Sequence, residues 1–123
     1  MLKVFYYANC ESCKNAIRFF KKELVRADYI EIIENPPSVE VLRIIYELSG
    51  RDLKKMFNTT GRAYSAMNLK NKMPSMTAEQ AFALMSANGK LIKRPILLAS
   101  DDCIIGFDTQ KWLVLAIKEE MNS

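Results

Sequence analysis

Apolar residues along the chain follow two periodicities, and these predict the order of strands and helices. Short runs of β-branched, aromatic and aliphatic residues between turn-forming residues are typical of buried strands. They predict strands over 2–7, 29–33, 96–99 and 103–107. Apolar residues spaced by three and four, with lysine and arginine on the other side, are typical of amphipathic helices. They predict helices over 13–26, 39–49, 52–56, 77–87 and 109–121.

The order of these elements predicts an α/β fold. The chain begins strand–helix–strand and ends with a strand–strand hairpin and a helix, which is the plan of a thioredoxin-like, glutaredoxin-type domain. Because a helix crosses between the first two strands, those strands should run parallel, and the hairpin strands should run antiparallel. We expect a four-stranded mixed sheet with flanking helices. In this prediction residues 1–123 form a single domain with a helical insert at about 38–88.

Composition and charge indicate the class of protein, its cellular location and its partners. The chain has 123 residues, of which 50% are hydrophobic and 26% charged, as in soluble globular domains. No apolar run approaches the ~20 residues that span a bilayer, and the first residues do not resemble a signal peptide. We therefore expect a cytoplasmic protein without a membrane partner. The net charge of +4 is spread along the chain, so direct nucleic-acid binding is not expected.

The histidine and cysteine counts exclude several kinds of site. The chain has no histidine, which excludes Cys–His and Ser–His–Asp catalysis and any His-ligated metal. Its three cysteines are too few for a disulfide framework, and a zinc site would need a carboxylate as a fourth ligand, so no metal is expected. Cys103 lies in a predicted strand, as expected for a buried structural thiol.

Two cysteines stand at the predicted junction between the first strand and the first helix. Cys10 follows the strand, with Asn9 before it as a candidate helix N-cap, and Cys13 lies in the first helical turn. Free backbone N–H groups and the helix dipole at such a junction favour the thiolate form of Cys10 and make it a nucleophile. Cys13 is close enough to form a disulfide with Cys10, as a resolving thiol. Alternatively, both cysteines are small buried apolar residues.

Charged neighbours should adjust the pKa of the Cys10 thiol. The carboxylate of Glu11 raises this pKa, and the cations of Lys14 and Arg94 lower it, so we expect a modest lowering. Arg94 precedes Pro95, which begins the third predicted strand, where a missing N–H is tolerated. The guanidinium of Arg94 is suited to holding an anion or a thiolate near Cys10. The alternative for Arg94 is a solvated surface arginine.

Several further segments join the cysteine pair in a recognisable set. These segments are Cys10-Glu-Ser-Cys13-Lys-Asn-Ala, Asn35-Pro-Pro-Ser, Leu48-Ser-Gly, Phe57-Asn-Thr-Thr-Gly61, Leu91-Ile-Lys-Arg94-Pro95-Ile96 and Gly106-Phe107. With this set the chain resembles the arsenate reductase–Spx (ArsC-like) family of thioredoxin-fold proteins over essentially its whole length. The resemblance also favours a cis bond before Pro95, which presents the preceding carbonyl toward the cysteine pair.

One branch of the family reduces arsenate. Its glutaredoxin-coupled enzymes use one nucleophilic cysteine and several arginines that hold the arsenate. By resemblance, Cys10 matches the nucleophile and Arg94 matches the arginine of the Arg-Pro pair. Phe107 stands where those enzymes have a further arginine. Because a tetrahedral dianion needs several charge-assisted hydrogen bonds, efficient arsenate reduction is not expected.

The Spx branch resembles the chain in having both cysteines and the Arg-Pro pair. Its members are redox-sensing transcriptional regulators that bind the C-terminal domain of the RNA polymerase α subunit, and their cysteine pair is a disulfide switch. They also use a glycine near the end of the second long helix, and Gly50 is close to that place. Its context Leu-Ser-Gly-Arg-Asp resembles the uncharacterised arsenate-reductase-related members more closely. A role in ending the helix explains Gly50 equally well.

The residues and the resemblance together give a ranked set of functions. The first is a thiol–disulfide oxidoreductase or reductase, coupled to glutathione, glutaredoxin or thioredoxin, with Cys10 attacking and Cys13 resolving. The second is an Spx-like regulator that binds the RNA polymerase α subunit, and the third is an arsenate reductase proper. The predicted catalytic residues are Cys10, Cys13 and Arg94, and Pro95 and Lys14 support them. We expect a monomer without a bound cofactor, with glutathione as a candidate reductant.

Overall fold

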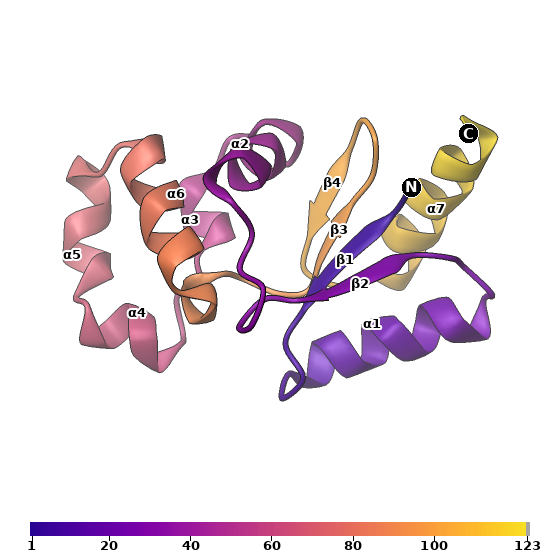
Figure 1. Cartoon of the computed structure of the whole chain (residues 1–123), viewed down its shortest axis with the longest axis horizontal. Coiled ribbons are helices and arrows are strands. Elements are labelled where there is room, and N and C mark those ends of the chain that lie inside the picture. The colour runs from indigo at the N-terminus through magenta and orange to yellow at the C-terminus, as the bar shows by residue number, and fades with distance from the viewer. Residues whose placement is uncertain (123) are drawn as a thin grey trace. The chain divides into compact units, whose positions relative to one another are not determined.

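The computed structural model describes residues 1–122, and it has the predicted α/β, thioredoxin-like fold (Figure 1). The chain divides into two compact units. The first unit combines Met1–Glu31 with the chain from Arg94 onward, and the second is Ile32–Lys93. The helical insert predicted at about 38–88 falls inside the second unit. No helix within residues 1–122 is long and apolar enough to cross a membrane.

The first unit contains the four-stranded mixed sheet that the sequence predicts. Its strands are β1 (Lys3–Tyr6), β2 (Asp28–Glu31), β3 (Ile96–Leu98) and β4 (Cys103–Ile105). Their order across the sheet is β2-β1-β3-β4. The β1–β2 pair is parallel, and the β1–β3 and β3–β4 pairs are antiparallel, as expected for a helical crossover followed by a hairpin.

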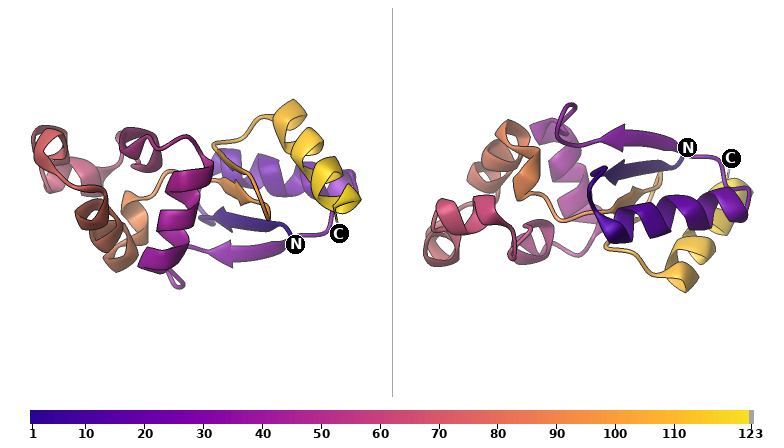
Figure 2. Two further views of the ribbon diagram at one scale, coloured as in Figure 1. Left: turned by 90° about the horizontal axis from the view of Figure 1, so that it is seen from above. Right: turned by 90° about the horizontal axis from the view of Figure 1, so that it is seen from below.

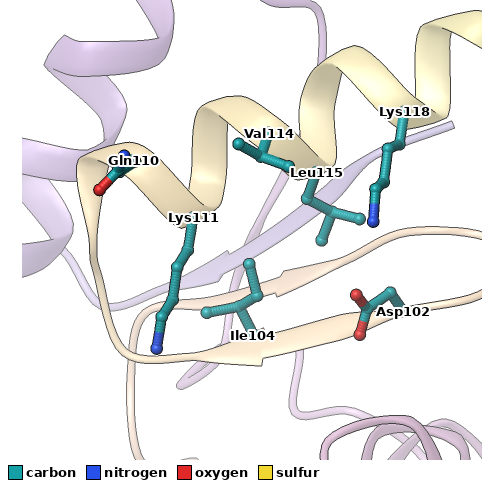
Figure 3. A pocket seen from close by; sticks show the side chains of 7 residues that line it. All are labelled: Asp102, Ile104, Gln110, Lys111, Val114, Leu115 and Lys118. Carbon is teal, nitrogen blue, oxygen red and sulfur yellow. The ribbon is translucent and has the colours of Figure 1, made fainter.

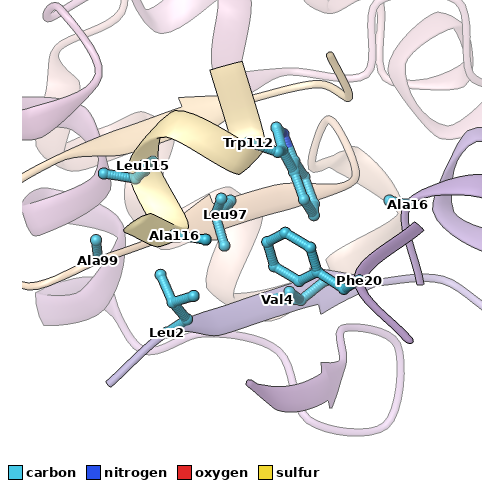
Figure 4. Close-up of a cluster of buried hydrophobic side chains, with 9 residues drawn as sticks. All are labelled: Leu2, Val4, Ala16, Phe20, Leu97, Ala99, Trp112, Leu115 and Ala116. Carbon is cyan, nitrogen blue, oxygen red and sulfur yellow. The ribbon is translucent and has the colours of Figure 1, made fainter. Parts of the chain in front are cut away.

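Two helices of this unit pack against one face of the sheet through a shared core (Figure 4). They are α1 (Glu11–Lys22) and α7 (Thr109–Met121). Phe20 of α1 and Trp112 of α7 are fully buried, with ring centroids 5.1 Å apart. The indole N–H of Trp112 donates to the carbonyl of Gly106 at 2.9 Å, so this buried polar group is paired. The core therefore fixes α1 on the strand that precedes it.

The second unit is helical (Figure 2). Its helices are α2 (Val39–Leu48), α3 (Leu53–Met56), α4 (Arg62–Ala66), α5 (Leu69–Lys72) and α6 (Ala78–Ala87), with 3₁₀ turns η1 (Met73–Ser75) and η2 (Gly89–Leu91). The sequence predicts α2, α3 and α6 but not α4 and α5. Helices of four or five residues complete little more than one turn, so apolar periodicity does not reveal them.

Gly50 ends α2 in the way that the sequence suggests. Its φ angle is +108°, a left-handed conformation that residues with a Cβ rarely adopt. The N–H of Arg51 then donates to the carbonyl of Tyr46 at 2.9 Å, as in a Schellman motif. Helix termination is therefore a sufficient structural reason for a glycine at this position.

A buried carboxylate ties α7 to the start of the chain and to the β3–β4 turn. Glu119 is only 6% exposed, and it accepts hydrogen bonds from the Met1 ammonium at 2.8 Å and from the Ser100 hydroxyl at 2.7 Å. It also accepts from the Ser100 N–H at 3.1 Å. These hydrogen bonds lower the pKa of Glu119, and the bond from the N-terminal ammonium has the largest effect. The sequence pattern gives no sign of this cluster.

We predict that Glu119→Gln reduces the free energy of unfolding at neutral pH by about 1–3 kcal/mol, because the remaining hydrogen bonds are no longer made to a charged group and one acceptor oxygen is lost. Since folding lowers the pKa of Glu119, its contribution is present above the ordinary value of 4.5 and is lost as pH falls through the lowered value. Urea unfolding at several pH values should therefore show the difference between wild type and variant shrinking in acid. Glu23→Gln, at an exposed position, is the control. A difference that does not change with pH would contradict the assignment.

Candidate functional site

Cys10 caps the N-terminus of α1 with its own side chain. Its backbone is extended, with φ −116° and ψ 119°, and its Sγ accepts a hydrogen bond from the N–H of Cys13 at 3.4 Å. The predicted N-cap, Asn9, is therefore wrong by one residue. N–H groups in the first turn of a helix have no partner within the helix, and here the sulfur atom takes one of them. The candidate nucleophile thus lies at the positive end of the helix dipole.

Ser12 adds a hydroxyl to the same sulfur atom. Its Oγ lies 3.4 Å from Cys10 Sγ, and toward a thiolate the hydroxyl is the donor. Sequence reasoning did not assign Ser12 a role. The sequence does place a serine between the two cysteines, near the start of a predicted helix. Short polar side chains at such positions often form hydrogen bonds with groups at the helix N-terminus.

Cys13 has a different environment from Cys10. Its side chain is 1% exposed, and its Sγ accepts the backbone N–H of Tyr7 at 3.5 Å. Burial raises the pKa of Cys13 to about 12, and the hydrogen bond that it shares with the Cys10 side chain adds to the rise. Cys13 is therefore a protonated thiol at neutral pH.

The pKa of Cys10 moves in the opposite direction. Partial burial raises it, but the hydrogen bonds from Cys13 and Ser12 and the charge of Arg94 outweigh burial, so the pKa is lowered. This is the direction that the sequence predicts. The cation that acts on Cys10 is Arg94, whereas Lys14 is exposed on α1. The structure thus brings together Cys10, whose thiolate form is favoured, and Cys13, which stays a protonated thiol.

Arg94 and Pro95 lie in the same unit as the cysteine pair. The Arg94–Pro95 peptide bond is cis, as the resemblance implies, and Pro95 is buried. Its carbonyl accepts the N–H of Gly106 at 2.8 Å, which joins the start of β3 to the end of β4. Arg94 is half-buried, with its guanidinium carbon 4.9 Å from the centroid of the Tyr7 ring, a cation–π contact. This contact means that Arg94 is not a freely solvated surface arginine.

Cys103 takes no part in this arrangement. It is 5% exposed at the start of β4, and burial raises its pKa to about 12, with the Asp102 carboxylate contributing. All three cysteines are free thiols. Within residues 1–122 no group of three or more cysteine, aspartate or glutamate side chains is placed to hold a metal ion.

Phe107 packs among aromatic residues rather than facing a ligand. Its ring centroid lies 5.8 Å from that of Phe19 and 5.2 Å from that of Trp112, edge-on to the indole. A phenylalanine has no hydrogen-bond donor, so Phe107 cannot contribute to binding an oxyanion. Of the arginines, only Arg94 is among the groups that shift the pKa of Cys10 in the described part of the chain.

A pocket of about 350 Å³ lies elsewhere in the first unit, between β4 and α7 (Figure 3). Ile104, Val114 and Leu115 supply its apolar surface, with Lys111 and Lys118 along α7. Its lining includes neither Cys10 nor Cys13. The candidate site at the N-terminus of α1 is therefore separate from this pocket.

We predict that Arg94→Gln and Ser12→Ala each raise the pKa of Cys10, because each removes a group that favours the thiolate. The pH dependence of Cys10 alkylation, measured in a Cys103→Ser background, gives this pKa. Arg26→Gln, at an exposed position, is the matched control and should leave it unchanged. Equal midpoints in the Arg94 and Arg26 variants would show that Arg94 does not act on Cys10.

The chain is similar to known proteins in sequence and in fold. A family model described as the ArsC family matches residues 5–115. The uncharacterized protein YusI of Bacillus subtilis is 38% identical over 106 residues, covering 86% of this chain and 90% of that protein. The crystal structure of a possible arsenate reductase from Streptococcus mutans UA159 is 36% identical with a TM-score of 0.82, covering 87% of this chain and 91% of that one.

A regulator is also among the relatives. Regulatory protein MgsR of Bacillus subtilis is 23% identical over 121 residues, covering 98% of this chain and 94% of that protein. The similarity thus extends over nearly the full length of proteins with different described roles.

Proposed function

Because the chain belongs to the ArsC family, we propose that it is a thiol–disulfide redox protein in which Cys10 is the nucleophile and Cys13 the resolving thiol. The proposal rests on the opposite pKa shifts of these two thiols and on the hydrogen bond from the Cys13 N–H to Cys10 Sγ. A lowered pKa supplies thiolate at neutral pH, and a raised pKa keeps the second thiol protonated until it is needed.

The exchange proceeds in two steps that balance in atoms and electrons. The Cys10 thiolate attacks one sulfur of a substrate disulfide, forms a mixed disulfide, and expels the other sulfur as a thiolate that takes up a proton. Cys13 then loses its proton and attacks the Cys10 sulfur, which releases the second substrate thiol. The substrate disulfide is reduced by two electrons, and the cysteine pair is oxidised by two electrons.

Regeneration needs an external thiol. Two molecules of glutathione, or one dithiol of glutaredoxin or thioredoxin, reduce the Cys10–Cys13 disulfide by the reverse exchange. The protein itself carries no bound cofactor in this scheme, because the two sulfur atoms hold both electrons. Arg94 favours the thiolate form of Cys10 before attack and again after the disulfide has been reduced.

Arsenate is a poorer fit as substrate. Each charge-assisted hydrogen bond to a dianion contributes about 1.5–3 kcal/mol, so a site with fewer arginines binds arsenate much more weakly. Here one arginine acts on Cys10, and Phe107 is occupied in aromatic packing. Arsenate reduction is therefore the third candidate function.

A redox-sensing regulator is the second candidate, and the similarity to MgsR over 98% of the chain favours it. In that case the Cys10–Cys13 disulfide is a switch, and the output is binding to the C-terminal domain of the RNA polymerase α subunit. The same two pKa shifts serve both functions, because a sensor must also form its disulfide rapidly.

We predict that Cys10→Ser abolishes the reduction of a glutathione mixed disulfide, because it removes the attacking sulfur. Cys13→Ser should instead accumulate the mixed disulfide at Cys10, since the resolving thiol is missing. Intact mass measurement after reaction detects the added glutathione. Cys103→Ser is the matched control and should react like wild type. Unchanged turnover in Cys10→Ser would refute the mechanism.

We predict separately that the purified C-terminal domain of the RNA polymerase α subunit does not retain the protein in either redox state if the chain is an oxidoreductase. Pull-downs run once with reduced protein and once with oxidised protein measure this. Retention in one redox state only, lost in Cys13→Ser, would establish the regulator instead.

A further inference from the structure

Helix α1 concentrates the positive charge of the chain beside the reactive cysteine. It carries four cations, Lys14, Arg18, Lys21 and Lys22, and one carboxylate, Glu11. Its net charge is therefore +3, against +4 for all 123 residues. The remaining residues together are close to neutral. Charge that looks evenly spread along the sequence is thus located mainly on one helix.

The four cations form a continuous basic face that begins one turn after Cys10. The spacings of four and three residues between Lys14, Arg18 and Lys21 place them along one side of the helix. All four side chains are exposed. At 1.5 Å per residue, the span from Lys14 to Lys22 is about 12 Å. Within residues 1–122 the salt bridges involve none of the four.

The opposite side of α1 is fixed in the core, so this face is held outward. Cys13, Ala16 and Phe20 are the buried residues of the helix. Phe20 packs on Trp112, and Ala16 belongs to the same apolar cluster. The basic face therefore has a constant position relative to Cys10 Sγ at the helix N-terminus. A molecule bound along the face would reach the nucleophile at one end.

We propose that this basic face selects acidic polypeptide segments, so that the preferred disulfide substrate is a cysteine flanked by aspartate and glutamate. The proposal rests on the thiol–disulfide exchange proposed for Cys10. A run of about four extended residues covers 12 Å, so alternate carboxylates of such a segment match the spacing of the cations. A polypeptide is favoured over a nucleic acid because it carries the sulfur atom that Cys10 must attack.

Complementary charge should act mainly on the rate of encounter. Opposite charges on two partners raise association rates by about 10- to 1,000-fold at low ionic strength, and salt screens the effect. The chemical step is unchanged. Cys10 displaces one sulfur of the bound disulfide, and Cys13 then resolves the mixed disulfide and frees the peptide thiol.

Two synthetic peptides test the selection. Each has one cysteine activated as its 2-thiopyridyl disulfide, flanked in one peptide by four glutamates and in the other by four lysines. Attack by Cys10 releases pyridine-2-thione, whose absorbance gives the rate. We expect wild type to react at least about tenfold faster with the acidic peptide at low salt, and within about twofold at 0.5 M salt, a concentration at which charges are screened (about 4 Å Debye length).

The triple variant Arg18→Gln, Lys21→Gln and Lys22→Gln should lose most of this preference, with Lys14 kept because it is adjacent to the cysteine pair. Glutamine retains helix propensity, and circular dichroism checks that the variant is folded. The matched control is Lys54→Gln, Lys55→Gln and Lys70→Gln, which removes the same charge from exposed positions in the second unit. The control should keep the preference for the acidic peptide.

The outcomes separate this inference from the proposed function. Equal rates for the two peptides with wild type, or equal loss in both triple variants, would overturn the basic face as a selector. Inhibition of the acidic peptide's reaction by a single-stranded oligonucleotide, without any peptide preference, would assign the face to nucleic acid instead. Failure of wild type to react with neutral 2,2′-dithiodipyridine would reject the thiol chemistry itself.

Discussion

The hydrogen bond from the N–H of Cys13 to Cys10 Sγ is the contact on which the rest of the site depends. It exists because a turn follows β1 and Cys10, with extended backbone, caps α1, so that its sulfur atom lies where the helix needs an acceptor. The same geometry places Ser12 and Cys13 in the first turn, within reach of that sulfur. One backbone arrangement thereby lowers the pKa of one thiol and positions its partner.

This arrangement is stable because α1 is packed against the core. Phe20, in the third turn, lies against Trp112 of α7, and Trp112 is hydrogen-bonded to Gly106 after β4. Pro95 accepts a hydrogen bond from the same Gly106, and Arg94 next to it contacts Tyr7. The last third of the chain thus packs against the C-terminal end of α1 and also supplies Arg94, which acts on Cys10.

The two sides of α1 have different tasks. Its apolar side builds the core, and its polar side carries most of the net charge of the chain. Since the candidate nucleophile caps the same helix, core packing, thiol activation and the charge met by an approaching partner are all properties of one element. Phe107 packs against Phe19 and Trp112 beside this core, and its ring has no hydrogen-bond donor for an oxyanion.

The sequence alone determined the fold class, the order of the longer strands and helices, and the choice of Cys10 as candidate nucleophile. These rest on local rules: apolar periodicity identifies elements of several turns, and two cysteines three residues apart after a strand identify a thiol pair. It missed α4 and α5, which are too short to show a period, and it placed the N-cap at Asn9 instead of Cys10.

Only the tertiary structure decided how the two thiols differ. The charged residues near Cys10, which the sequence shows, predicted a modest lowering of the pKa of its thiol. Burial of Cys13, its bond to the Tyr7 N–H, and the approach of Arg94 from 84 residues away in the chain come from packing between distant segments. The Glu119 cluster with Met1 and Ser100 is of the same kind. A pKa depends on solvent exclusion and on distances across the fold, and neither is encoded in the order of residues along a single element.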